Sequence, residues 1–214
     1  MKQFVLAITV LLAMSGIAWA GKEAYRLVMS KDTEVCSAIL ALFNDDLRKH
    51  GAIQYDYHNI FVSWQPMSLP DETAPGSHCG EIRKAVLDID NNGQDEIVLR
   101  TSLCWHSVLT DSLFIFSKTS EVPARLSWRN MGELLSGHSG VIGAGPYELV
   151  LWPQSKKGEL RPTLSDPWVL ELMVLNGTAY VSMTDRNYGY IAAIAKYRGG
   201  STLEDICYFE QSSR

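Results

Sequence analysis

The chain has 214 residues, a formal net charge of −5 at pH 7 and a hydrophobic content of 46%. This acidic balance argues against nucleic acid and anionic membrane surfaces as partners, because binding to either depends on basic patches that displace counterions. The length and the hydrophobic content predict one globular domain with a substantial core.

The first twenty residues have the pattern of a secretory signal peptide. Met1-Lys2-Gln3 is a short basic start, residues 4–14 are apolar, and Ala18-Trp19-Ala20 is a small-residue cleavage signature. The apolar run is too short to span a membrane comfortably. We therefore expect residues 1–20 to be removed and residues 21–214 to form a single exported domain, periplasmic or secreted, with no membrane span.

The clearest predicted helix covers residues 32–50. Asp32 suits the N-cap position, and Gly51 suits the position after the last turn. An apolar stripe at three- and four-residue spacing predicts that one face packs into the core. The stripe consists of Val35, Cys36, Ile39, Leu40, Phe43 and Leu47.

Residues 85–100 are expected to form a strand, a sharp acidic turn and a second strand. Asp88, Asp90 and Asn92 alternate along the turn, Gly93 permits a tight reversal, and Glu96 adds another carboxylate. An all-oxygen set of this kind suits a hard cation, and calcium is favoured over magnesium because the geometry is loose and rich in ligands. An EF-hand is not expected, since Leu99 stands where that motif has its bidentate Glu and strands flank the loop.

This turn resembles the calcium loop of the FG-GAP and VCBS repeats, in which an Asp-x-Asp-x-Asp/Asn-Gly-x-x-Asp/Glu turn joins two strands of a propeller blade. The resemblance implies Asp88, Asp90, Asn92 and Glu96 as side-chain ligands of calcium and Gln94 as a ligand through its carbonyl. The match covers about a dozen residues in one copy, whereas the family repeats its unit several times. The alternative is an ordinary Asn-Asn-Gly hairpin turn with solvated acids.

The rest of the chain is predicted to be mainly strands and loops. Asn176-Gly177 is a strong signal for a type I′ hairpin, and the glycine-rich stretch 136–146 is interpreted as a mobile loop. A short helix is expected at 128–135. Strands are expected at 59–66, 111–116, 147–152, 168–175, 178–184, 188–197 and 206–209. The predicted fold class is therefore β-rich α+β: an antiparallel sheet or meander, propeller-like in one version, with one N-terminal amphipathic helix and two disulfides.

The exported domain contains four cysteines: Cys36, Cys79, Cys104 and Cys207. An even number in an exported chain predicts two disulfides, for which three connectivities exist. A hairpin centred on the acidic turn pairs positions whose numbers sum to about 185, so residue 81 faces Cys104. We favour Cys79–Cys104 across this hairpin and Cys36–Cys207 between the helix and the last strand. A thiol nucleophile or a zinc site is the alternative, although no Cys-x-x-Cys spacing occurs.

No catalytic or cofactor-binding residues are predicted. The five histidines have no metal-ligand spacing, and the catalytic alternatives are His106 near Asp111 or His138 beside Ser139. We expect an exported, non-catalytic binding protein with a calcium-stabilised hairpin, of the inhibitor or immunity type. One alternative is a carbohydrate-binding protein of the cell envelope, because exposed tryptophans suit sugar stacking. The other is an uncharacterised hydrolase. The tryptophans of the exported domain are Trp64, Trp105, Trp128, Trp152 and Trp168.

Overall fold

The computed structural model describes nine stretches of the chain. They are residues 24–55, 58–69, 80–105, 108–127, 138–143, 147–148, 163–164, 168–185 and 191–211. The predicted signal peptide, the predicted helix at 128–135, Cys79 and His106 lie outside these residues.

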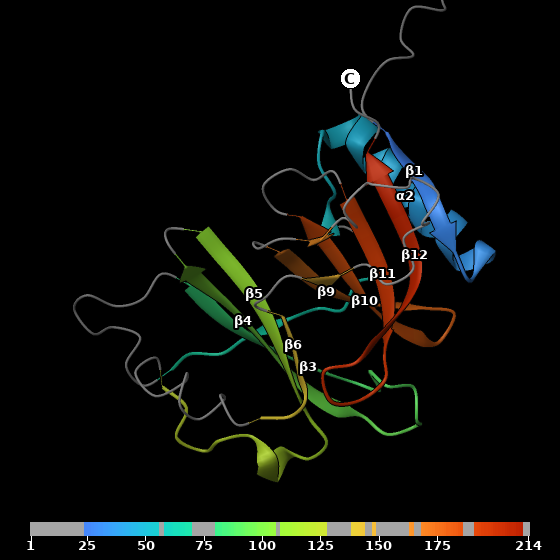
Figure 1. The fold of residues 1–214 in the computed structure, drawn as a ribbon. Coiled ribbons are helices and arrows are strands. Elements are labelled where there is room, and N and C mark those ends of the chain that lie inside the picture. Colours follow the sequence, from blue (N-terminus) through green and yellow to red (C-terminus); the bar gives the residue numbers. More distant parts are fainter. Residues whose placement is uncertain are drawn as a thin grey trace, which may run out of the picture.

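Two five-stranded sheets form the framework, and neighbouring strands in both are antiparallel (Figure 1). The central sheet has the order β2 (Gln65–Pro66), β3 (Gly80–Leu87), β4 (Glu96–Trp105), β5 (Val108–Phe116) and β6 (Val141–Gly143). The terminal sheet has the order β1 (Tyr25–Ser30), β12 (Leu203–Gln211), β11 (Ile191–Tyr197), β10 (Thr178–Asp185) and β9 (Trp168–Leu175). A separate pair joins β7 (Tyr147–Glu148) to β8 (Thr163–Leu164), and η2 (Thr119–Glu121) is a short 3-10 turn.

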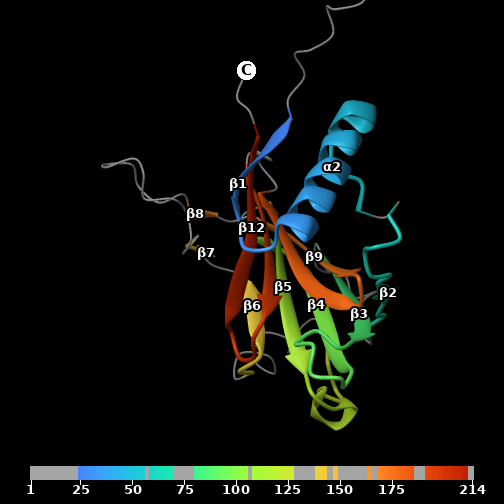
Figure 2. The same ribbon diagram turned by 90° about the vertical axis from the view of Figure 1, so that its right-hand side faces the viewer.

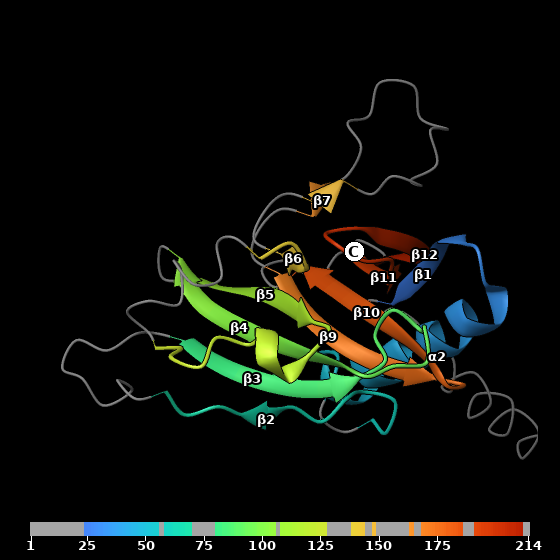
Figure 3. The same ribbon diagram turned by 90° about the horizontal axis from the view of Figure 1, so that it is seen from below.

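The main core lies between the two sheets, whose strands are seen together in Figure 3. Alternate side chains point to opposite faces of a strand, so each sheet presents every second residue to the other. Val98 and Leu113 of the central sheet are fully buried with Leu172 and Val181 of the terminal sheet. The two sheets therefore form a sandwich, with the acidic hairpin at one end of it.

Helix α2 (Thr33–His50) covers the outer face of the terminal sheet (Figure 2). Its start is fixed by Asp32, whose carboxylate accepts the backbone N–H of Val35 at 3.1 Å, and Gly51 ends it in the left-handed conformation. Ile39 and Phe43 are buried against the sheet. The predicted helix, its caps and its apolar face are confirmed.

A disulfide joins Cys36 of α2 to Cys207 of β12, as predicted. A disulfide of this kind indicates an oxidising, extracytoplasmic setting. The second predicted pair, Cys79–Cys104, involves a position outside the described residues and stays a prediction. Over the part of the chain that the structure covers, none of the helices has the length and apolar character needed to cross a membrane.

The expected antiparallel, β-rich α+β class is confirmed, but the propeller-like version is wrong. The described strands form two open sheets, and none closes on itself. A propeller needs a repeated blade, and the loop that implied one occurs once. The predicted Asn176-Gly177 hairpin is confirmed: both residues have positive φ, 52° and 75°, and they join β9 to β10.

Three local predictions needed correction. In the hairpin of β3 and β4, Glu81 faces Ser102 and not Cys104, because β4 already begins at Glu96 and the loop is centred one residue earlier than expected. Within the predicted strand 59–66, only Phe61 and the two residues of β2 pair with another strand. Phe61 forms an isolated bridge to Met173. The predicted glycine-rich loop contains β6, where Gly143 packs so closely on β5 that a Cβ atom there would lie 2.7 Å from the Asp111 carbonyl oxygen.

Candidate functional site

The acidic loop joins two adjacent strands of the central sheet. Leu87 at the end of β3 pairs with Glu96 at the start of β4, so residues 88–95 make the turn. This register places the side chain of Glu96 beneath the loop, where the residue is 5% exposed. The strand pairing therefore brings a buried carboxylate to the two aspartates of the turn.

Hydrogen bonds within the loop turn the aspartates inward. The carboxylate of Asp88 accepts the backbone N–H groups of Asn92 and Gly93, each at 2.8 Å, and Asp90 accepts the N–H of Asn92 at 3.1 Å. Gly93 has φ 91°, a conformation that an L side chain rarely adopts. The sequence folds into this turn because its short acidic side chains satisfy backbone N–H groups that would otherwise have no partner.

Asp88, Asp90 and Glu96 come together at the centre of the turn. Each offers a carboxylate oxygen, and these three oxygens lie within 4.8 Å of one another. Three carboxylates at this separation could hold a metal ion, and oxygen ligands are those that hard cations prefer. Each carboxylate has about four lone-pair positions, so the hydrogen bonds already made leave room for a cation.

Electrostatics at the site favour added positive charge. Burial raises the pKa of Glu96, and the nearby charges of Asp90 and then Asp88 raise it further. The backbone N–H of Ile89 donates to Glu96 at 3.1 Å and partly offsets this effect. A proton or a metal ion would relieve the same repulsion.

Asn92 and Gln94 are the other two predicted ligands. The side-chain oxygen of Asn92 accepts the N–H of Gln94 at 2.8 Å, and its amide nitrogen donates to Asp90 at 2.9 Å. Both residues thus support the turn in this structure. Their roles as metal ligands stay predictions.

Asn91 has a role that sequence reasoning missed. Its side-chain oxygen accepts the N–H of Ala179 at 2.7 Å, and its amide nitrogen lies 3.2 Å from the Ala179 carbonyl oxygen, so the loop is tied to β10 of the opposite sheet. The sequence signal was the asparagine itself, because asparagine is enriched among turn residues with positive φ, and Asn91 has φ 62°.

Of the two histidines named as catalytic alternatives, His106 lies outside the described residues and His138 is described. His138 stacks on Phe116 with ring centroids 4.2 Å apart, and its Nε2 bonds to the carbonyl of Ile115, which is a packing role. His58, which sequence analysis passed over, has Nε2 at 2.8 and 2.9 Å from the two oxygens of Asp46. Asp46 belongs to α2 and is 2% exposed.

A buried ionic network links the two sheets. Arg100 of β4 lies 3.0 Å from Asp111 of β5 and also pairs with Glu171 of β9. Asp111 accepts the Ser102 hydroxyl at 2.6 Å, and Glu171 accepts the indole N–H of Trp64 at 2.7 Å. Burial raises the pKa of Glu171, although Arg100 acts in the opposite direction.

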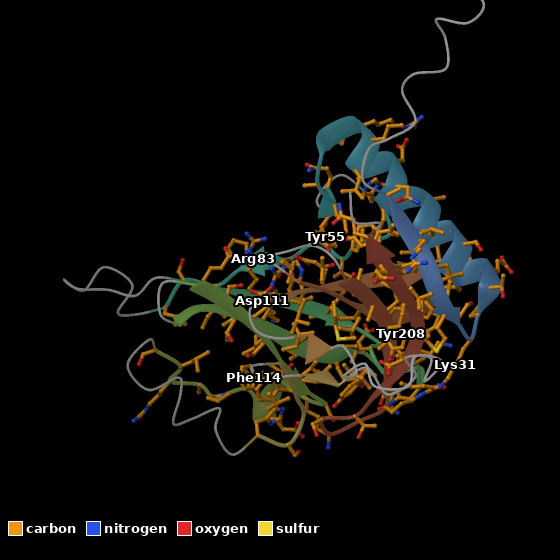
Figure 4. The ribbon with its side chains drawn as sticks, turned by 45° about the horizontal axis from the view of Figure 1, so that its top comes forward. Lys31, Tyr55, Arg83, Asp111, Phe114 and Tyr208 are labelled. Carbon is orange, nitrogen blue, oxygen red and sulfur yellow. A yellow bond between two sulfur atoms is a disulfide. The ribbon has the colours of Figure 1, made fainter. Side chains whose placement is uncertain are left out.

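A cleft of about 370 Å³ opens beside this network. Figure 4 labels two of its lining residues, Tyr55 and Arg83, together with the buried Asp111. Of the five tryptophans named above, Trp64 is the one whose side chain the structure describes, and it lies in the wall. Among the described residues, the cleft is lined by Tyr55, His58, Asn59, Phe61, Val62, Ser63, Trp64, Arg83 and Glu171.

Comparison of the chain with models of protein families, with curated proteins and with solved structures finds no match in any of the three. The acidic loop and the cleft are therefore the features of the molecule that bear on its function.

Proposed function

We propose that this chain is an exported, non-catalytic binding protein whose β3–β4 hairpin is stabilised by calcium. The observation that carries the proposal is the convergence of Asp88, Asp90 and Glu96, whose oxygens lie within 4.8 Å of one another. The similarity of the loop to the FG-GAP and VCBS calcium turns points to the same ion.

Calcium suits the loop better than other cations. Its coordination shell accepts six to eight oxygens in irregular geometry, whereas magnesium requires a near-ideal octahedron. We propose that Asn92, through its side chain, and Gln94, through its carbonyl, complete the ligand set. Extracellular calcium modules bind with dissociation constants of roughly 10⁻⁴ to 10⁻³ M, which fits an extracytoplasmic protein.

For the binding partner we propose a protein, with this chain acting as an inhibitor or immunity-type module. The support is the acidic balance of the chain, which favours encounter with a basic surface. Carbohydrate binding is the second candidate, and the cleft that contains Trp64 favours it. Neither candidate requires a catalytic group.

Calorimetric titration of the exported, oxidised protein with CaCl₂ tests the metal assignment. We expect one binding event in the submillimolar to millimolar range, much weaker binding of MgCl₂, and no calcium binding by the Asp90→Ala variant. Asp95→Ala is the matched control, because Asp95 is an exposed acid of the same loop outside the carboxylate group. Equal calcium binding by both variants would contradict the proposal.

A further inference from the structure

We propose that the cleft beside Trp64 binds a small neutral saccharide. This inference rests on the carbohydrate-binding candidate and names its site. It does not depend on the calcium loop, because none of the lining residues belongs to residues 88–96.

The wall of the cleft is a preformed surface. The backbone N–H of Val62 donates to the Leu172 carbonyl at 2.9 Å, and the N–H of Val174 donates to the Ile60 carbonyl at 2.7 Å. These bonds hold residues 60–62 along the free edge of β9. Because the segment is fixed by backbone bonds, its side chains are positioned before a ligand arrives.

Trp64 is fixed in the same way. Its indole N–H donates to Glu171 at 2.7 Å, and the Arg100 guanidinium lies 5.7 Å from the ring centroid. Trp64 and Phe61 are both only partly buried and line the cleft. The parts of these rings that reach the cleft can pack against the C–H groups of a sugar ring.

His58 contributes a ring of defined orientation. Its Nε2 faces both oxygens of the buried Asp46, which also accepts the backbone N–H of Gln54 at 2.8 Å. These contacts fix the orientation of the His58 ring in the wall. Asn59 and Ser63, both exposed, add an amide and a hydroxyl to the same wall.

The charged groups of the wall already have protein partners. Arg83 lies 3.0 Å from Glu81, and Glu171 is held by Arg100 and by Trp64. Because these two charges are already paired within the protein, they do not favour an ionic ligand. It offers partly buried aromatic rings beside both donors and acceptors, which is the set that a molecule rich in hydroxyl groups can satisfy, since each hydroxyl both donates and accepts.

Nuclear magnetic resonance titration of the isotopically labelled, exported protein tests this assignment. Maltose, cellobiose and diacetylchitobiose are added separately up to tens of millimolar, in EDTA, while the indole N–H resonance of Trp64 is followed. We expect at least one of these sugars to shift that resonance saturably. Asn59→Ala and Ser63→Ala should each weaken binding of that sugar several-fold, because both replace exposed side chains of the wall without disturbing the core.

Gln65→Ala is the matched control, since Gln65 is an exposed amide in β2 that does not line the cleft, and it should bind as the unaltered protein does. No saturable shift with any of the three sugars would overturn the inference, as would unchanged affinity in both wall variants. The titration contains no calcium, so its failure is separate from a failure of the metal assignment.

Discussion

Glu96 has two opposing effects on the stability of the folded protein at neutral pH. Its carboxylate accepts the backbone N–H of Ile89 and completes the acidic group, but it is buried beside two aspartates, and its pKa is raised. A carboxyl group with a raised pKa in the folded state stabilises the fold when protonated. That contribution is present below the ordinary pKa of 4.5 and is lost as the pH rises through the higher folded value.

The variant Glu96→Gln separates these two effects. In EDTA at pH 7 the variant should melt at a higher temperature than the unaltered protein, because the amide can still accept the Ile89 N–H without adding a third negative charge. In the presence of calcium the unaltered protein should melt at the higher temperature, because the variant has lost one of the calcium ligands. Thermal melts in both conditions measure this, and a variant that is less stable in EDTA as well would contradict the charge argument.

The pH dependence follows from the same group. Protons and calcium compete for the carboxylates, so the calcium-induced rise in melting temperature should be largest near pH 7 and should shrink as the pH falls toward 4.5. The shift of melting temperature on adding calcium, measured at several pH values, checks this. A calcium effect that grows on acidification would be inconsistent with a carboxylate site.

The side chain of Asn91 provides a further test, of the contact between the acidic loop and β10. Asn91→Ala removes both side-chain bonds to Ala179 and leaves a β-carbon at positive φ without the compensation that asparagine has. We expect a loss of about 1–3 kcal/mol in the free energy of unfolding, measured by urea denaturation. Gln94→Ala, an exposed change in the same loop, should cost far less.

At the scale of elements, sequence predicted those whose signals are local. Helix α2 carries its own caps and stripe, and the β9–β10 turn carries Asn-Gly, so both were predicted closely. Strand β1 was not predicted and β6 was taken for a loop, because short edge strands depend on a distant partner for their hydrogen bonds. The Asp46–His58 contact was missed for the same reason: Asp46 lies on a helix face whose cover comes from another segment.

The disulfide links α2 covalently to β12 of the terminal sheet. In the chain-entropy model, closing a loop of 171 residues stabilises the fold by up to about 5 kcal/mol. The paired change Cys36→Ser/Cys207→Ser should therefore lower the denaturation midpoint strongly without altering calcium affinity, because the loop lies on the other sheet. This variant is preferable to a reductant, which would act on all four cysteines. A midpoint equal to that of the unaltered protein would contradict this assignment.

At the scale of the whole molecule, the chain is a sandwich whose two sheets are joined by polar contacts as well as by the core. Asn91 ties the acidic loop to β10, and the Arg100 network ties β4 and β5 to β9. The composition and turn signals predicted the β-rich class, but the division into two sheets could not be predicted, since alternating strands are compatible with several pairings. Calcium binding that stabilises the hairpin should therefore raise the free energy of unfolding of the whole domain.

The most direct test of the calcium assignment is a thermal melt of the exported, oxidised protein in EDTA and in millimolar calcium. It is run beside Asp88→Ala/Asp90→Ala and the control Asp95→Ala. Ligand linkage predicts about 2.7 kcal/mol of added stability at a hundred times the dissociation constant. The calcium-dependent rise should occur in the unaltered protein and in Asp95→Ala and should disappear in the double variant. Identical melting in EDTA and calcium for all three proteins would mean that the loop is an ordinary acidic hairpin.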